Sequence, residues 1–174
     1  RALRDLETNR QLRAVAALEA PDRCRSHFTA ARWSEFQRDV AFFRAQLPPE
    51  RWLLTQIDHG FNGTPVWLIA GHAIASAVEP TARGIAALSL IDTALLGGAW
   101  AAALASFGWR GTLAPLVFWG TNAFGDFSWT GGAFLRHDWL AACIASLCLL
   151  RRGRPLASGF FLGLAALLRV FPAL

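Results

Sequence analysis

Lysine and methionine are both missing from this sequence of 174 residues. All 17 basic residues are therefore arginine, and the formal net charge is +5. Arginines of the first third alternate with acidic residues, and the later ones flank apolar segments, so they do not form the basic stripe of a nucleic-acid-binding face. We expect no nucleic-acid partner. Exclusive use of arginine, with abundant alanine and leucine, indicates a bacterial source.

Cysteine is also scarce. Cys143 and Cys148 lie in an apolar segment and Cys24 has no partner nearby in the sequence, so no disulfide framework is indicated. The chain begins at Arg1 without a methionine and stops inside the apolar run 171–174. We therefore expect an internal fragment of a longer protein.

Charged residues are few in the second half of the chain. Residues 1–83 hold 20 of the 29 charged residues, and residues 84–174 hold nine. This contrast predicts an extracytoplasmic or interfacial helical region over 1–83 and a transmembrane region over 84–174. The expected fold class is all-α, a polytopic membrane helical bundle of about four spans that is incomplete at the C-terminus.

The polar region shows helical periodicity. Apolar residues spaced by three and four predict amphipathic helices over 3–19 and 33–47, the second with Ser34 as its N-cap. Pro48 and Pro49 end that helix, and a short helix is expected over 50–57.

Apolar segments of different lengths follow a turn-rich stretch, 58–65. Residues 66–78 are too few for a crossing, which needs roughly 20 residues, so we expect a helix lying at the membrane interface. The expected spans, separated by a tight loop at 109–111 and by longer connections, are 84–107, 112–124, 139–150 and 156–174.

Arginine-rich loops set the predicted orientation. Short loops that carry arginine favour the cytoplasmic side, which places Arg110 and the stretch 151–154 inside. Residues 1–83 then lie outside a bacterial inner membrane, with the lipid bilayer as a partner. Arg136, His137, Asp138 and Arg169 are expected to gather at the outer face. Ionisable residues held there by apolar helices indicate a functional site, although Arg136 and Asp138 could instead form an ion pair that orders their loop.

The order of these parts resembles the GT-C superfamily of membrane glycosyltransferases. Residues 39–43 (DVAFF) resemble the carboxylate motif of its first extracytoplasmic loop, and 62–68 (NGTPVWL) resemble its Gly/Pro turn. Residues 136–139 (RHDW) resemble the start of a later span. Residues 159–172 (GFFLGLAALLRVFP) are similar to a Gly-rich span ending in a basic residue and proline, as in the branch that uses polyprenol-phosphate-mannose.

This resemblance implies transfer of a sugar from a polyprenyl-phosphate donor to an extracytoplasmic acceptor. Asp39 would be the catalytic base, with Asp5 as the alternative because the family carboxylate lies close after a span. Arg169, Arg136 and His137 would bind the donor phosphate, since arginine makes charge-assisted contacts to phosphate oxygens. No metal ligands are assigned, and a divalent metal cofactor is left open. The sequence does not indicate the oligomeric state.

A second interpretation is a non-catalytic membrane protein or a transporter-like subunit. Asp92 lies inside a long apolar segment, where an unpaired carboxylate is costly. It could bond one helix to another, or it could mark a transport site. A transporter is expected to gather its polar residues around Asp92, whereas the enzyme is expected to bring Asp39 to the Arg136 and Arg169 cluster.

Overall fold

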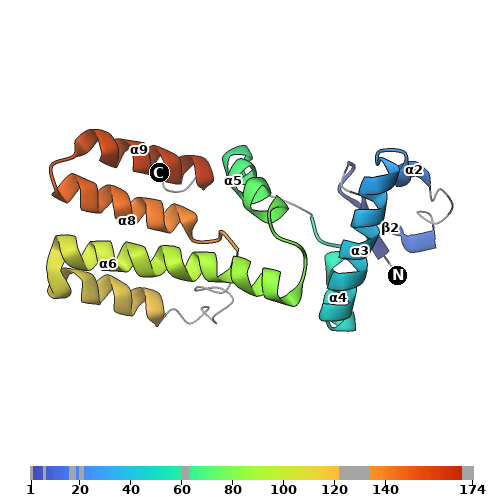
Figure 1. Ribbon diagram of the computed structural model, residues 1–174, viewed down its shortest axis with the longest axis horizontal. Helices are drawn as coiled ribbons and strands as arrows, with labels where there is room; N and C mark the ends of the chain where they lie inside the picture. Colours follow the sequence, from blue (N-terminus) through green and yellow to red (C-terminus); the bar gives the residue numbers. More distant parts are fainter. Residues whose placement is uncertain are drawn as a thin grey trace. The chain divides into compact units, whose positions relative to one another are not determined.

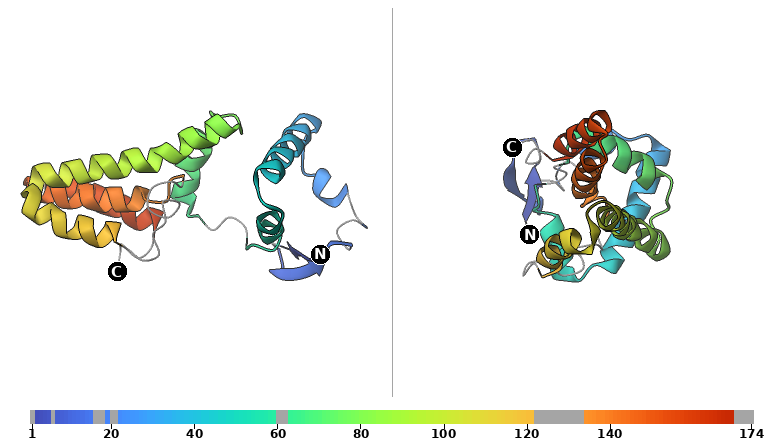
Figure 2. Two further views of the ribbon diagram at one scale, coloured as in Figure 1. Left: turned by 90° about the horizontal axis from the view of Figure 1, so that it is seen from below. Right: turned by 90° about the vertical axis from the view of Figure 1, so that its left-hand side faces the viewer.

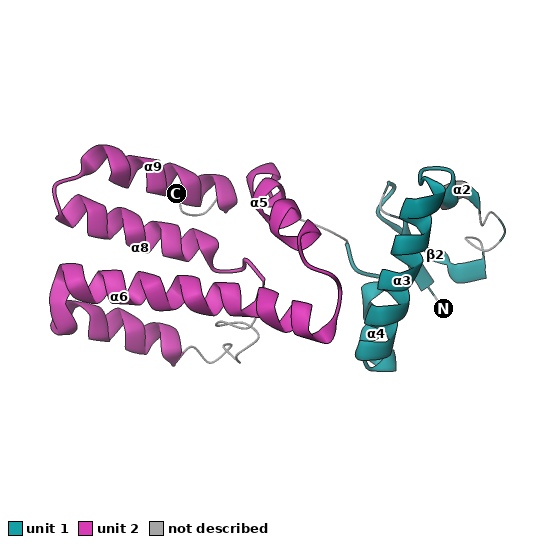
Figure 3. Cartoon of the chain, in the orientation of Figure 1, with its two compact units in different colours: residues 1–62 teal, residues 63–174 magenta. Residues whose placement is uncertain are grey.

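The computed structural model describes residues 2–5, 7–15, 19, 22–59, 63–121 and 134–169. The chain forms two compact units, residues 1–62 and 63–174 (Figure 3). This boundary lies upstream of the change in charge density at 83/84. Helix α5 (Pro65–Ser76) belongs to unit 2, where it contacts α9 (Pro155–Leu168). The described part is mostly helical, which confirms an all-α class at that level.

Unit 1 begins with a β-hairpin where the sequence predicted a helix over 3–19. Strands β1 (Ala2–Asp5) and β2 (Arg10–Arg13) pair antiparallel, with Leu3 opposite Leu12. The side chain of Asp5 accepts hydrogen bonds from Glu7 N and Thr8 Oγ1 and thereby closes the turn. Asn9, in the left-handed region at φ 56°, completes the turn, and asparagine tolerates that conformation.

Helices α3 (Ala30–Gln46) and α4 (Pro49–Thr55) correspond to the helices predicted over 33–47 and 50–57, whereas the short helix α2 (Asp22–Arg25) was not predicted. Helix α3 starts earlier than predicted, because the Thr29 side chain accepts from Arg32 N and caps it in place of Ser34. Leu47 and Pro48 separate α3 from α4, and Pro49 is the first residue of α4. Arg4 ties the hairpin to the end of α4, since Arg4 N donates to Gln56 O at 2.9 Å.

Unit 2 is built around the helical hairpin α6 (Ala82–Gly120) (Figure 1). The helix reverses at Gly108, whose φ of 70° and ψ of 175° lie outside the helical region. A positive φ costs a residue with a Cβ atom about 1–2 kcal/mol, so glycine suits this position. The Thr112 hydroxyl donates to Gly108 O at 2.9 Å and secures the start of the second arm. The turn predicted at 109–111 is thus displaced by one residue.

Helices α8 (Asp138–Arg151) and α9 form a second hairpin, as the sequence predicted. Gly153, at φ 71°, makes the turn between them. The Ser146 and Ser158 hydroxyls hydrogen-bond across the buried interface at 2.9 Å. Helix α8 packs against both α6 and α9, around a core of small and aliphatic side chains that contains Ala99, Ala103, Ile144 and Cys148.

Both turns of unit 2 lie at the same end of its helices (Figures 1 and 2). That end carries exposed Arg110, Arg151, Arg152 and Arg154. The opposite end of α8 begins at Asp138, and the opposite end of α9 is capped by Arg169. The fold therefore separates an arginine-rich end from an end that holds acidic, basic and imidazole side chains.

Candidate functional site

Asp92, in the first arm of α6, is the centre of the polar cluster in unit 2. Its side chain is fully buried, at 0% exposure. The Arg136 N–H donates to Oδ1 at 3.1 Å and to Oδ2 at 2.9 Å. The His137 N–H donates to Oδ2 at 3.2 Å. A buried carboxylate needs such partners, because an isolated charge out of water is very costly.

The imidazole of His137 completes the partners of Asp92. Its Nδ1 lies 2.9 Å from Asp92 Oδ2, and the residue is only 4% exposed. The edge of one ring meets the face of the other where His137 packs on Trp119, with centroids 5.2 Å apart. Trp119 comes from the second arm of α6. Residues from both arms of α6 therefore hold this ring.

The backbone before His137 has an unusual conformation. Leu135 has a φ of 46°, in the left-handed region that leucine rarely adopts, and its side chain is buried. The indole Nε1 of Trp67 donates to Leu135 O at 2.8 Å. Trp67 lies in the first turn of α5, and its ring also packs edge-to-face on Phe134 at 6.0 Å. Helix α5 is thereby linked directly to the polar cluster.

Asp138 and Arg169 bring two more charges to the same end. Asp138 is half-buried at the first position of α8, where its Oδ1 accepts from Trp139 N at 2.8 Å. Its carboxylate lies near enough to Asp92 and Arg169 for electrostatic interaction with each. The negative Asp92 disfavours its charge, whereas the positive Arg169 favours it. Arg169 follows the last turn of α9, and its N–H donates to Ala165 O.

The structure therefore brings together the residues that the sequence placed at the outer face. Arg136, His137, Asp138 and Arg169 all lie at the end of unit 2 that is opposite the arginine turns. Asp92 joins them, because it binds the backbone of Arg136 and His137 and the His137 ring and so connects α6 to the segment that leads into α8. Sequence reasoning did not foresee Trp67 and Trp119 as partners of this cluster, because indoles of apolar segments carry no pattern of their own.

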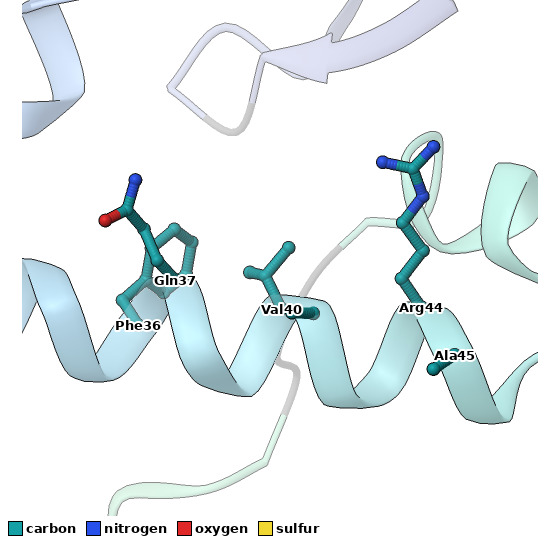
Figure 4. A pocket seen from close by; sticks show the side chains of 6 residues that line it. Phe36, Gln37, Val40, Arg44 and Ala45 are labelled. Carbon is teal, nitrogen blue, oxygen red and sulfur yellow. The ribbon is translucent and has the colours of Figure 1, made fainter.

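Asp39 and Asp5, the two candidates for the base, belong to unit 1. Asp39 is half-buried on α3, and Asp5 is engaged in the hairpin turn. A shallow groove runs along α3 near Asp39, lined by Phe36, Gln37, Val40, Ala41, Arg44 and Ala45 (Figure 4). The Gln37 and Arg44 side chains stand at its two ends, with Val40 between them.

The described ranges contain no group of three or more His, Cys, Asp or Glu side chains that could hold a metal ion. Comparison of the chain with protein-family models, with curated proteins and with solved structures found no match.

Among the described residues, Ala82–Gly120 is the one helix whose length and apolar composition would allow it to cross a membrane. Most of its apolar stretch is not buried inside the protein. Helices α5 and α9 are shorter and also apolar.

Proposed function

We propose that this chain is part of a membrane glycosyltransferase that uses a polyprenyl-phosphate sugar donor. The observation that carries the proposal is the grouping of Arg169 and Asp138 with the Asp92-bound segment at one end of a helical bundle. The bundle supplies a cation at that end, and arginine binds phosphate oxygens through charge-assisted hydrogen bonds. The donor phosphate is proposed to bind Arg169. Arg136 and His137, on the segment bound by Asp92, are proposed to take part in the same phosphate site.

Arg169 would assist sugar transfer by stabilising the leaving phosphate. When an acceptor oxygen attacks the anomeric carbon, the bond between that carbon and the phosphate oxygen breaks, and the electron pair leaves with the phosphate. A fixed guanidinium is most effective where this negative charge develops. Asp138 would balance the charge of Arg169 before the donor arrives, because the two opposite charges interact electrostatically.

The exposed apolar surface of unit 2 supports a membrane location. Phe118, Leu156 and Phe160 are 82%, 91% and 67% exposed. Large apolar side chains that remain exposed in such numbers typically mark a membrane or protein interface. The second arm of α6 carries two further exposed apolar side chains, Leu113 and Val117.

We further propose the polytopic topology of four crossings, with the arginine turns in the cytoplasm. Helices α8 and α9 each have 14 residues. At 1.5 Å per residue they extend about 21 Å, less than the ~30 Å hydrocarbon core. With the turns at the inner surface, the Asp92 cluster would lie in the outer part of the bilayer. The many hydrogen bonds to Asp92 suit that depth, because water is scarce there.

A transporter-like subunit remains the second candidate, and it is favoured by the full burial of Asp92. The sequence predicted a different centre for each function. In unit 2 Asp92, His137, Asp138 and Arg169 form one polar layer, so the donor-phosphate site of the enzyme and the transport site would share these residues. The two functions differ in whether the bond between sugar and phosphate is broken.

The test is to incubate the intact protein in liposomes with a panel of radiolabelled polyprenyl-phosphate sugars and acceptor glycans. The enzyme is expected to transfer label to an acceptor and to release polyprenyl phosphate. A transporter is expected to move solute or lipid across the bilayer with the bond between sugar and phosphate intact. Absence of transfer across the panel, with Arg169→Gln and wild type giving equal background, would contradict the proposed function.

A further inference from the structure

An open groove runs along the second arm of α6, starting beside the turn at Gly108. Its lining residues follow one another at spacings of three and four, which places them on one face of the helix. They include Arg110, Leu113, Ala114, Val117, Phe118 and Thr121. Ala114 lies one helical turn from both Arg110 and Phe118 and has only a methyl group, so it forms a low floor between longer side chains. The groove is therefore an apolar channel with a cationic end.

Arg110 and Trp109 form this cationic end. The guanidinium carbon of Arg110 lies over the Trp109 ring, 5.2 Å from its centroid, and both side chains are exposed. A guanidinium stacks through its face, so the N–H donors in its plane stay available to an anion. An indole beside a basic side chain is typical of the membrane–water interface, at the level of the lipid headgroups. This end of the groove thus suits the phosphate of a headgroup.

The positive charge around this end has no acidic residue close to it in the sequence. The two turns of unit 2 bring exposed arginines to the same end of its helices, namely Arg110, Arg151, Arg152 and Arg154 (Figures 1 and 2). The sequence has no Asp or Glu between Asp92 and Asp126, and none after Asp138. The electrostatic complement of this end is therefore an anion.

The length of the groove matches one leaflet of a bilayer. Arg110 and Thr121 are 11 positions apart. At 1.5 Å per residue this is about 17 Å, and half of the hydrocarbon core is about 15 Å. Between the two residues the lining is apolar, with Leu113 and Val117 each 51% exposed and Phe118 82% exposed. An acyl chain whose headgroup is at Arg110 would thus lie along the groove as far as the bilayer centre.

We propose that this groove binds one anionic phospholipid, with the lipid phosphate at Arg110 and an acyl chain along Leu113, Val117 and Phe118. The arginines of the turn between α8 and α9 add to the attraction, since each basic residue near the surface favours anionic lipid. The inference goes beyond the proposed function, because the sugar donor is assigned to the opposite end of unit 2. It rests on that function only through the membrane location, and in the proposed topology the lipid belongs to the cytoplasmic leaflet.

The first experiment compares two lipids that share their acyl chains. The intact protein in a mild detergent is titrated with palmitoyl-oleoyl phosphatidylglycerol or with the matching phosphatidylcholine, and bound lipid is counted by native mass spectrometry. The first bound lipid is expected to favour phosphatidylglycerol about tenfold. Arg110→Gln is expected to remove this preference, because a charge-assisted contact to the phosphate is lost. Arg83→Gln, the same change on an exposed residue at the other end of α6, is the matched control and should preserve it.

The second experiment tests the groove and leaves every charge in place. Ala114→Leu raises the floor of the groove, and it is expected to weaken binding of phosphatidylglycerol about tenfold. This change corresponds to lost contact with roughly two CH₂ groups of the acyl chain. Ala101→Leu, the same substitution on the first arm of α6, is the control and should have no effect. Both alanines are exposed, so the fold is expected to accept leucine at either position.

Distinct outcomes separate this inference from the proposed function. Equal affinity of the wild-type protein for the two lipids overturns the inference, and this comparison needs no variant. If Arg110→Gln abolishes the preference but Ala114→Leu binds as wild type, the arginines attract lipid without the groove and the inference fails. A lipid preference without sugar transfer to any acceptor overturns the proposed function alone. Recovery of the intact protein in the soluble fraction of disrupted cells overturns both.

Discussion

At the scale of single residues, a buried carboxylate organises the candidate site. Asp92 would be expensive to leave alone, and the chain satisfies it with two consecutive amides and an imidazole. Those donors orient the segment that also carries Arg136 and leads into Asp138. The charged side chains thus depend on a residue that is itself out of reach of solvent.

Arg169→Lys is expected to raise the KM for the polyprenyl-phosphate donor about tenfold, although the charge is kept. Lysine lacks the planar fork with which arginine binds two phosphate oxygens at once. Steady-state transfer kinetics with the intact protein would measure the change. Arg152→Lys, on the exposed turn between α8 and α9, is the control and should leave the KM unaltered. Equal KM values for wild type and Arg169→Lys would argue against a phosphate contact.

The base assignment from the sequence remains a prediction with a simple test. Asp39→Asn keeps the size of the side chain and removes the base, so turnover is expected to fall about 100-fold while donor binding survives. Asp5→Asn should act differently, because Asp5 closes a turn: it is expected to lower thermal stability more than turnover. Normal turnover in Asp39→Asn together with an inactive, stably folded Asp5→Asn would transfer the base role to Asp5.

At the scale of elements, local sequence patterns predicted most of the helices but not the N-terminal β-hairpin. Turns at Gly108 and Gly153 follow from glycine between apolar runs, a pattern readable in the sequence. The segment 3–19 has helical spacing of its leucines, yet Leu3 and Leu12 are cross-strand partners. The opposing signal is Asn9, which follows Thr8 and favours a turn. The hairpin is also stabilised by Arg4, which hydrogen-bonds to the end of α4, and together these two contributions outweigh the helical periodicity.

Gly108→Ala is expected to lower the free energy of unfolding by about 1–2 kcal/mol. A Cβ there would meet nothing within 4 Å, so the cost arises from the positive φ and not from a clash. Gly97→Ala is the matched control, because that glycine is also open but lies inside the helix, where alanine is favoured by about 0.5–1 kcal/mol. Denaturant titration of the purified protein would compare the two. Equal effects would show that Gly108 does not adopt this turn.

At the scale of the whole molecule, the proposed topology rests on the different charged residues at the two ends of unit 2. The arginine-rich turns lie at one end and the Asp92 cluster at the other. In a bilayer these two ends would face different environments, since a cationic loop favours the cytoplasmic side and ionisable groups within the apolar region require partners.

Cysteine labelling in cells tests this topology. The three native cysteines are first replaced. Arg152→Cys is then expected to resist a membrane-impermeant maleimide until the inner membrane is opened, whereas Glu79→Cys should react in intact spheroplasts. Glu79 precedes α6 and is exposed, so the pair compares positions of similar accessibility. Reaction of Arg152→Cys from outside would reverse the orientation, and identical labelling of the two positions would remove the crossing between them.

The sequence by itself determined the helical hairpins of unit 2, because lengths of apolar runs and the placement of glycine and proline act over a few neighbouring residues. It also identified Arg136, His137, Asp138 and Arg169 as a group, since polar residues at the ends of apolar segments are conspicuous. Only the tertiary structure decided that Asp92 binds residues 44 and 45 positions away, and that Trp67 reaches Leu135. Those bonds depend on which helices pack together and on their register along the helix axes. Side-chain packing over the whole unit determines both, and a local sequence pattern does not contain this information.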